Sequence, residues 1–182
     1  MKSKNSRQRI ALDMDEVIAD VLPKFLDYYE KDIGHKLSKE EFWGQKIYEL
    51  VGAGHIRNYL YDPGFFADLP VIENSQEVVK WLNEHYDVFL VSAAMQFRNS
   101  LADKRDWAQK HFPFIHWKNI VFCGDKSIIQ TDYMIDDHAK NLETFKGKAL
   151  LYTATHNIHE KRFTRVSNWL EIRTFFEKEL NG

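Results

Sequence analysis

Short apolar runs alternate along the chain with longer segments whose apolar residues recur at helical spacing. The apolar runs cover residues 10–12, 87–91, 120–122, 133–135 and 148–152, and the helical spacing covers residues 21–33, 74–85, 99–110 and 169–180. Strands that alternate with helices are typical of a parallel sheet whose faces are covered by helices. The pattern therefore predicts an α/β fold, with a Rossmann-like parallel sheet of about five strands flanked by helices.

The segment from about residue 35 to residue 70 interrupts this alternation. It is rich in aromatic residues, holds the turn 62–64, and contains Gly44, Gly52, Gly54 and Gly64. No run within it predicts a buried strand, and its glycines favour turns. Together with the helix predicted over 21–33, we interpret it as a small helical cap inserted after the first strand. The predicted domains are a catalytic core over 1–20 and 71–182 and a cap over 21–70.

Composition narrows the class of ligand. The chain has 182 residues, of which 44% are hydrophobic and 14% aromatic, so it can bury a sizeable core. Its formal net charge of -2 argues against binding to a nucleic acid polymer, because such proteins usually carry a strongly basic face. A small anionic ligand needs only a few local donors and remains compatible with this charge.

Cysteine content and hydropathy indicate where in the cell the protein is expected. The single cysteine, Cys123, lies in an apolar run, which predicts a buried thiol, and it cannot form a disulfide within the chain. The first residues lack the apolar core of a signal peptide, and no apolar stretch approaches the roughly 20 residues that a membrane span needs. We therefore expect a cytoplasmic protein with no membrane partner. The sequence leaves open whether it forms a homodimer.

Polar residues stand where the predicted strands end. Asp13 and Asp15 follow the first apolar run, Ser92 ends the second, Lys126 lies just beyond the third, and Asp136 and Asp137 follow the fourth. In an open parallel sheet, ligands bind outside the carboxyl ends of the strands. Taken alone, an Asp-x-Asp or an Asp-Asp pair is more often a turn or a helix cap. The occurrence of all these residues at strand ends favours a common site.

Clustered carboxylates require a cation. Two carboxylates about 4 Å apart repel each other by about 4 kcal/mol at an effective dielectric constant of 20. Hard oxygen ligands without His or Cys indicate Mg²⁺, which also coordinates substrate phosphate. Phosphoryl transfer needs such a cation together with donors to the phosphoryl oxygens. We assign the nucleophile to Asp13, the general acid and base to Asp15, and phosphate binding to Ser92 and Lys126.

The order Asp-x-Asp, Ser, Lys, Asp-Asp resembles the four motifs of the haloacid dehalogenase superfamily of phosphatases. Within it, the 12–20, 63–70 and 88–92 stretches are similar to the 5'(3')-deoxyribonucleotidases. The resemblance implies hydrolysis of nucleoside monophosphates, with deoxyribonucleotides preferred, through an aspartyl-phosphate intermediate. It also implies that Asp13, the backbone carbonyl of Asp15 and the side chain of Asp137 hold Mg²⁺, and that Asp136 supports these ligands from behind.

The resemblance further implies a substrate pocket in the cap. The pairs Phe42-Trp43 and Phe65-Phe66 would line the part that receives base and sugar, because aromatic faces stack on bases. The chain departs from the family pattern at several positions: Glu16 stands in place of Gly, Val21 in place of an aromatic residue, Ala93 and Ala94 in place of a hydroxyl residue and a proline, and Gly124 in place of Arg. These departures affect the pocket more than the nucleophile and the metal ligands.

Three other functions fit parts of the pattern. A phosphatase of the same build could act on a sugar phosphate or another small metabolite. A signalling receiver domain also uses an acceptor Asp, Mg²⁺, a hydroxyl and a Lys, but it has them in a different order and lacks the insertion after the first strand. A phosphate-binding module without catalysis would not need both Asp13 and Asp15. A nucleotide phosphatase therefore accounts best for the sequence.

Overall fold

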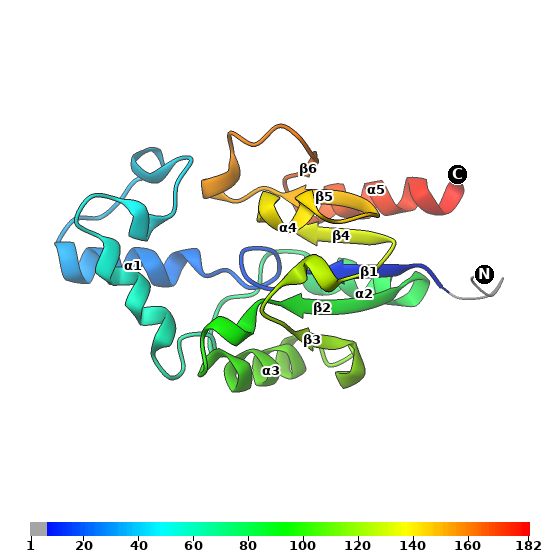
Figure 1. The fold of residues 1–182 in the computed structure, drawn as a ribbon, viewed down its shortest axis with the longest axis horizontal. Helices are drawn as coiled ribbons and strands as arrows, with labels where there is room; N and C mark the ends of the chain where they lie inside the picture. The colour runs from blue at the N-terminus through cyan, green and yellow to red at the C-terminus, as the bar shows by residue number, and fades with distance from the viewer. Residues whose placement is uncertain (1–6) are drawn as a thin grey trace.

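A parallel β-sheet forms the centre of the computed structural model, which describes residues 7–182 (Figure 1). Its strands are β1 (Arg9–Leu12), β2 (Asp87–Ser92), β3 (Ile120–Phe122), β4 (Tyr133–Asp136), β5 (Lys148–Tyr152) and β6 (Thr164–Val166). The strand order is β3-β2-β1-β4-β5-β6, and all neighbouring strands are parallel. The predicted α/β fold is confirmed. The sixth strand, β6, was not predicted, because only Val166 of its three residues is buried.

The α-helices are α1 (Leu22–Ile33), α2 (Ser75–His85), α3 (Ser100–His111), α4 (Ala139–Glu143) and α5 (Trp169–Asn181). Gly34 ends α1 in the left-handed conformation (φ 77°), and its N–H donates to the carbonyl of Glu30. At the start of α5, the side chain of Asn168 accepts from the N–H of Glu171. These local signals explain why the helices predicted from spacing begin and end within one residue of those observed.

Both faces of the central strands are buried. Ile10 and Leu12 of β1 belong to the larger hydrophobic cluster, which includes residues of α2 and α5, whereas Ala11 packs on the other face with Met134 and Leu151. Cys123 is also buried in this second cluster, as predicted. Strands covered on both faces read as continuous apolar runs rather than alternating patterns, which is why they could be recognised in the sequence.

The cap lies at one end of the molecule and enters the chain between β1 and α2 (Figure 1). It consists of α1 and the 3₁₀ helices Lys39–Phe42, Ile47–Glu49 and Gly54–Tyr61. Its interior is aromatic: Phe25 lies 5.5 Å from Tyr48 and 5.4 Å from Phe65 between ring centroids. The insertion of a helical cap after the first strand is confirmed, and the limits 21 and 70 stay a prediction.

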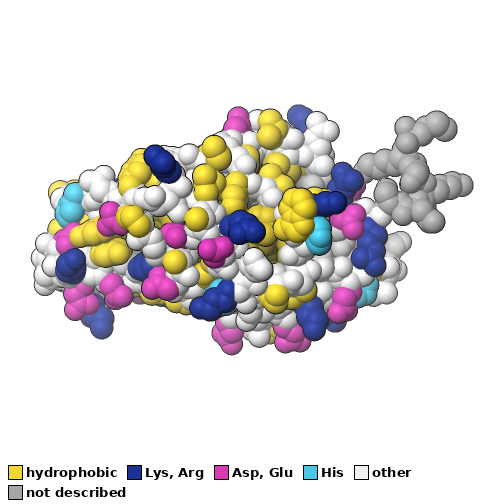
Figure 2. Space-filling model, turned by 90° about the horizontal axis from the view of Figure 1, so that it is seen from below, with side chains coloured by type: hydrophobic (Ala, Val, Ile, Leu, Met, Phe, Trp, Pro, Cys, Tyr) yellow, Lys and Arg dark blue, Asp and Glu magenta, His cyan; other side chains and the backbone are white. Residues whose placement is uncertain are grey.

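The surface mixes charges of both signs. On the face shown in Figure 2, basic and acidic side chains of the described residues lie interspersed among hydrophobic ones. None of the helices described within residues 7–182 is long and apolar enough to cross a membrane. The cytoplasmic location stays a prediction.

Candidate active site

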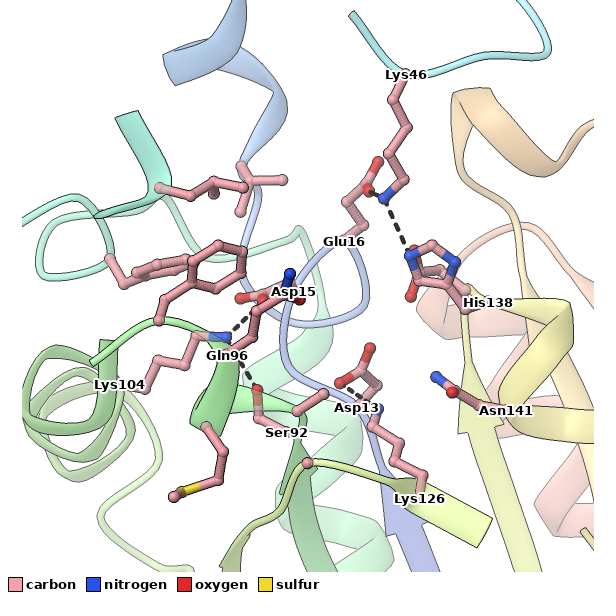
Figure 3. A pocket seen from close by; sticks show the side chains of 18 of the residues that line it. Asp13, Asp15, Glu16, Lys46, Ser92, Gln96, Lys104, Lys126, His138 and Asn141 are labelled. Atoms are coloured by element: carbon pink, nitrogen blue, oxygen red, sulfur yellow. Dashed lines mark hydrogen bonds and ion pairs between the residues drawn. The ribbon is translucent and has the colours of Figure 1, made fainter. Parts of the chain in front are cut away.

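Figure 3 shows Asp13, Asp15, Ser92 and Lys126 together at the carboxyl ends of the strands. Asp13, Asp15, Ser92, Lys126 and Asp137 all line a cavity of about 740 Å³. Backbone pairing fixes the first of them, because the N–H of Asp13 donates to the carbonyl of Ile135 at the end of β4 (3.0 Å). The topology thus brings together the residues that the sequence predicted as one site.

Lys126 lies between two buried carboxylates. Its Nζ is 2.6 Å from Oδ1 of Asp13 and 2.7 Å from Oδ2 of Asp136. Burial raises the pKa of Asp13, but the charge and hydrogen bond of Lys126 outweigh it and leave this pKa below its usual value. Burial and the nearby Asp13 raise the pKa of Asp136. Lys126 therefore favours the ionised form of Asp13, as a nucleophile requires.

Asp136 is not among the residues that line the cavity. Its Oδ1 accepts from the backbone N–H of His138 (2.8 Å), and the amide of Asn141 donates to both of its oxygens (3.0 Å each). Fixed in this way, the carboxylate aims the ammonium of Lys126 at Asp13. The placement agrees with a supporting role behind the cavity wall.

Lys104 is a second buried cation that the sequence analysis missed. From α3, its Nζ donates to Oδ2 of Asp15 (2.5 Å) and to Oγ of Ser92 (2.9 Å), and it lies 4.4 Å from the ring centroid of Phe66 (Figure 3). In the sequence, α3 is too polar to single out one lysine. The sequence nevertheless contained a signal that Lys104 is buried. The buried face of α3 consists of residues at helical spacing: Ser100, Lys104, Trp107 and Ala108.

Asp137 has the most unfavourable electrostatic surroundings of the site. Its side chain is 2% exposed, and its Oδ1 is buried without a hydrogen-bond partner among the described residues. Burial, the charge of Glu16 and the other nearby carboxylates raise its pKa well above the usual value. A buried carboxylate in this condition is costly unless a cation compensates it.

Carboxylate oxygens of Asp13, Asp136 and Asp137 lie within 4.8 Å of one another. A divalent cation beside Asp13 and Asp137 would neutralise their repulsion and supply the missing partner of Asp137 Oδ1. The donors are oxygens, as Mg²⁺ prefers. This acidic cluster could therefore bind a divalent metal ion.

Glu16 adopts a backbone conformation that ordinarily favours glycine. Its φ is 58°, in the left-handed region, which costs an ordinary residue about 1–2 kcal/mol. The carboxylate compensates through Lys46 of the cap, whose Nζ lies 3.0 Å from Oε2. Burial opposes ionisation, yet Lys46 and His156 lower the pKa of Glu16 to about 2. The left-handed conformation suits a Gly at this position, and the ion pair explains how Glu is tolerated.

We expect Glu16→Gly to be more stable than Glu16→Ala by about 1 kcal/mol, because both lose the ion pair but only glycine adopts positive φ without strain. Urea unfolding of the two variants beside the wild type measures the difference. Equal stabilities, or a more stable Ala variant, would contradict the argument from backbone strain.

The cap aromatics predicted for the pocket have different positions. Phe66 lines the cavity, whereas Phe42 and Phe65 are buried in the hydrophobic core and do not line it. Trp43 is 52% exposed and also lies outside the cavity lining. The apolar wall contains other residues that the sequence analysis did not single out for this purpose: Phe25, Tyr48, Leu60 and Phe97, with Arg57 beside them.

The chain has the fold of haloacid dehalogenase-like proteins. A haloacid dehalogenase-like hydrolase from Streptococcus pneumoniae superposes with a TM-score of 0.61, covering 93% of this chain and 98% of that one at 13% sequence identity. At this level of sequence identity, the structural similarity shows a shared fold and nothing about activity. It agrees with the class of fold predicted from the strand-end motifs.

Sequence comparison identifies the family. The profile described as "5' nucleotidase, deoxy (Pyrimidine), cytosolic type C protein" matches residues 7–179, and the chain belongs to this family. A Staphylococcus epidermidis protein, provisionally named 5'(3')-deoxyribonucleotidase, is 43% identical over 173 residues, which are 94% of this chain and 97% of that protein. The 5'(3')-deoxyribonucleotidase of Bacillus subtilis is 42% identical over 165 residues, 90% of this chain and 95% of that protein. The predicted resemblance, and the predicted class of phosphoric monoester hydrolase, are confirmed.

Proposed function

We propose that the protein hydrolyses nucleoside monophosphates, with 2'-deoxyribonucleotides preferred, in a Mg²⁺-dependent reaction. The observation that carries this proposal is one cavity that combines Asp13, Asp15, Ser92 and Lys126 with an aromatic wall. The acidic pair and the two polar donors suit phosphoryl transfer. The aromatic wall suits a flat base, and the names of the relatives support a deoxynucleotide.

Mg²⁺ would be held by Asp13, the backbone carbonyl of Asp15 and Asp137. When bound, it supplies positive charge that stabilises the phosphoryl oxygens. The buried and unpartnered Oδ1 of Asp137 supports this assignment. Its donors, all oxygens, fit the preference of this ion.

Asp13 attacks phosphorus through a carboxylate oxygen. The bond from phosphorus to the leaving oxygen breaks, its electron pair goes to that oxygen, and Asp15 donates the proton that completes the alcohol. A water molecule then attacks the aspartyl-phosphate and gives a proton to Asp15. The bond between phosphorus and Asp13 breaks, which releases phosphate and restores both carboxyl groups.

The contacts of Asp15 suit this proton transfer. Lys104 holds Oδ2, while Oδ1 is buried and has no hydrogen-bond partner among the described residues. One oxygen is thus fixed in place and the other is available to carry the proton. Lys104 also holds Ser92 Oγ, so the acid and a phosphate donor are positioned by the same cation.

Phe66 connects the phosphate site to the apolar wall. Its ring lies 4.4 Å from Lys104 Nζ and 6.2 Å from the ring centroid of Phe97. A nucleoside attached to a phosphate at Ser92 and Lys126 could therefore place its base against aromatic faces. Stacking of a base on an aromatic side chain contributes roughly 1–3 kcal/mol. The proposed partner is thus a small phosphate monoester.

A hydrolysis panel tests the proposal. It compares nucleoside monophosphates, their 2'-deoxy forms and sugar phosphates, each with Mg²⁺ and with EDTA. We expect deoxynucleotides to have the highest kcat/KM and EDTA to abolish turnover. Activity that persists in EDTA would contradict the metal requirement. Faster hydrolysis of a sugar phosphate than of every nucleotide would contradict the proposed substrate.

A further inference from the structure

His156 bridges two carboxylates at the edge of the proposed metal site. Its Nε2 lies 3.3 Å from Oδ2 of Asp137, and its Nδ1 lies 3.5 Å from Oε2 of Glu16. The side chain is 10% exposed, and neither ring nitrogen has a hydrogen-bond partner of good geometry among the described residues. A buried imidazole between two acids requires an explanation, because unsatisfied polar groups are costly in the interior.

The loop that carries His156 is fixed to the residue that it contacts. The adjacent Asn157 donates through Nδ2 to the backbone carbonyls of Asp137 and Tyr152, at 2.7 Å each. Arg165 in turn donates to Oδ1 of Asn157 (2.9 Å) and to its carbonyl (2.8 Å). The imidazole is therefore held against Asp137 by the fold itself and not by a flexible contact.

Asp137 differs from the other carboxylates of the site. Asp13 and Asp136 contact Lys126, Asp15 contacts Lys104, and Glu16 contacts Lys46. Among the described residues, the ion pairs of Asp137 involve only the imidazoles of His138 and His156. Its position therefore depends on these two side chains.

A ring nitrogen of His138 already accepts a hydrogen bond from the cap and cannot hold Asp137. Lys46 Nζ lies 3.0 Å from Nε2 of His138, and an ammonium offers donors only, so this nitrogen must act as the acceptor. The same nitrogen is 3.7 Å from Oδ2 of Asp137 and cannot donate to it. This hydrogen bond also argues against a second metal ion held by Asp137, His138 and His156, although ligand atoms of these three lie within 4.8 Å of one another.

We propose that His156 is a positioning residue for the metal site. Its Nε2, 3.3 Å from Oδ2 of Asp137, packs against this side of the carboxylate, which leaves the unpartnered Oδ1 for the cation. The contacts of Asn157 with Asp137 and with Arg165 hold the loop in this position. The inference rests on the proposed metal-dependent function. Outer partners of this kind typically change metal affinity 10- to 100-fold when they are removed.

Mn²⁺ binding tests the inference without substrate. Free Mn²⁺ is titrated by electron paramagnetic resonance against the wild type, His156→Ala, His156→Gln and the control His159→Ala, which changes an exposed histidine of the same loop. We expect His156→Ala to weaken binding about 10-fold or more, His156→Gln to restore part of it through its amide donor, and His159→Ala to match the wild type. Thermal unfolding of the metal-free proteins shows whether each variant is folded.

Equal Mn²⁺ affinity of the wild type and both folded His156 variants would overturn the inference. Kinetics give a second measurement: the activity lost in His156→Ala should return as Mg²⁺ is raised, because positioning affects occupancy of the site. A loss that persists at saturating Mg²⁺ would also overturn it. The proposed function fails separately, if the wild type binds Mn²⁺ but hydrolyses no nucleotide.

Discussion

Asp13→Asn is expected to lower kcat for a deoxynucleoside monophosphate about 10⁴-fold or more, a loss typical of removing a nucleophile. The amide has nearly the same shape but no charged oxygen to attack phosphorus. Among the described residues, the change leaves Asp136 as the one carboxylate partner of Lys126. Steady-state kinetics measure the loss, and Asp106→Asn, which changes an exposed carboxylate on α3, serves as the control.

Trapping the intermediate makes this prediction more specific. Wild type mixed with radiolabelled substrate and quenched in acid should carry label on the protein, whereas Asp13→Asn should carry none. Turnover by the folded variant at the wild-type rate, or equal labelling of both proteins, would exclude Asp13 as the attacking group.

Asp15→Asn is expected to show the second largest loss, about 10²–10⁴-fold for nucleotides, since general acid catalysis contributes in this range. The loss should shrink for aryl phosphates with acidic leaving groups, because a stable phenolate needs no proton when the bond breaks. A series of aryl phosphates of graded leaving-group pKa measures this dependence.

The contacts that Asp15→Asn preserves make this comparison decisive. The asparagine retains an oxygen that can accept the hydrogen bond of Lys104, so the contact with Ser92 is preserved. A uniform loss across the series would assign Asp15 a purely structural role. A loss that grows with leaving-group pKa would support its role as the acid.

The sheet was predictable because of how parallel strands are buried. β1, β2 and β4 have buried residues on both faces, so their sequences contain continuous apolar runs, and the polar residues that end these runs necessarily meet at one edge. β6 escaped prediction because it lies at the edge of the sheet and buries one residue, Val166.

The site was predictable only as far as its residues follow strands. Asp13, Ser92 and Asp137 do, whereas Lys104 comes from the inner face of a polar helix and Lys46 from the cap. His156 lies in the loop after β5, and its contact with Asp137 depends on the fold of that loop. No local pattern distinguishes Lys46 or His156 from ordinary surface side chains, and the helical spacing that places Lys104 on the buried face of α3 does not by itself mark a site residue.

The cap illustrates a different difficulty. A residue that packs in the interior of a small domain and one that lines a pocket are both apolar or aromatic. Phe65 and Phe66 are adjacent and equally buried, at 2% exposed, yet only Phe66 lines the cavity. Only the direction of each side chain separates the two roles, and that direction is set by tertiary packing.

The backbone at Glu16 also restricts how relatives of this protein can diverge. A glycine there satisfies the left-handed turn by itself, whereas a glutamate needs the cation that Lys46 provides from the cap. Changes at positions 16 and 46 are therefore expected to be inherited as a pair. The loop that follows the nucleophile would then change together with the cap during evolution, although the two segments are separate along the chain.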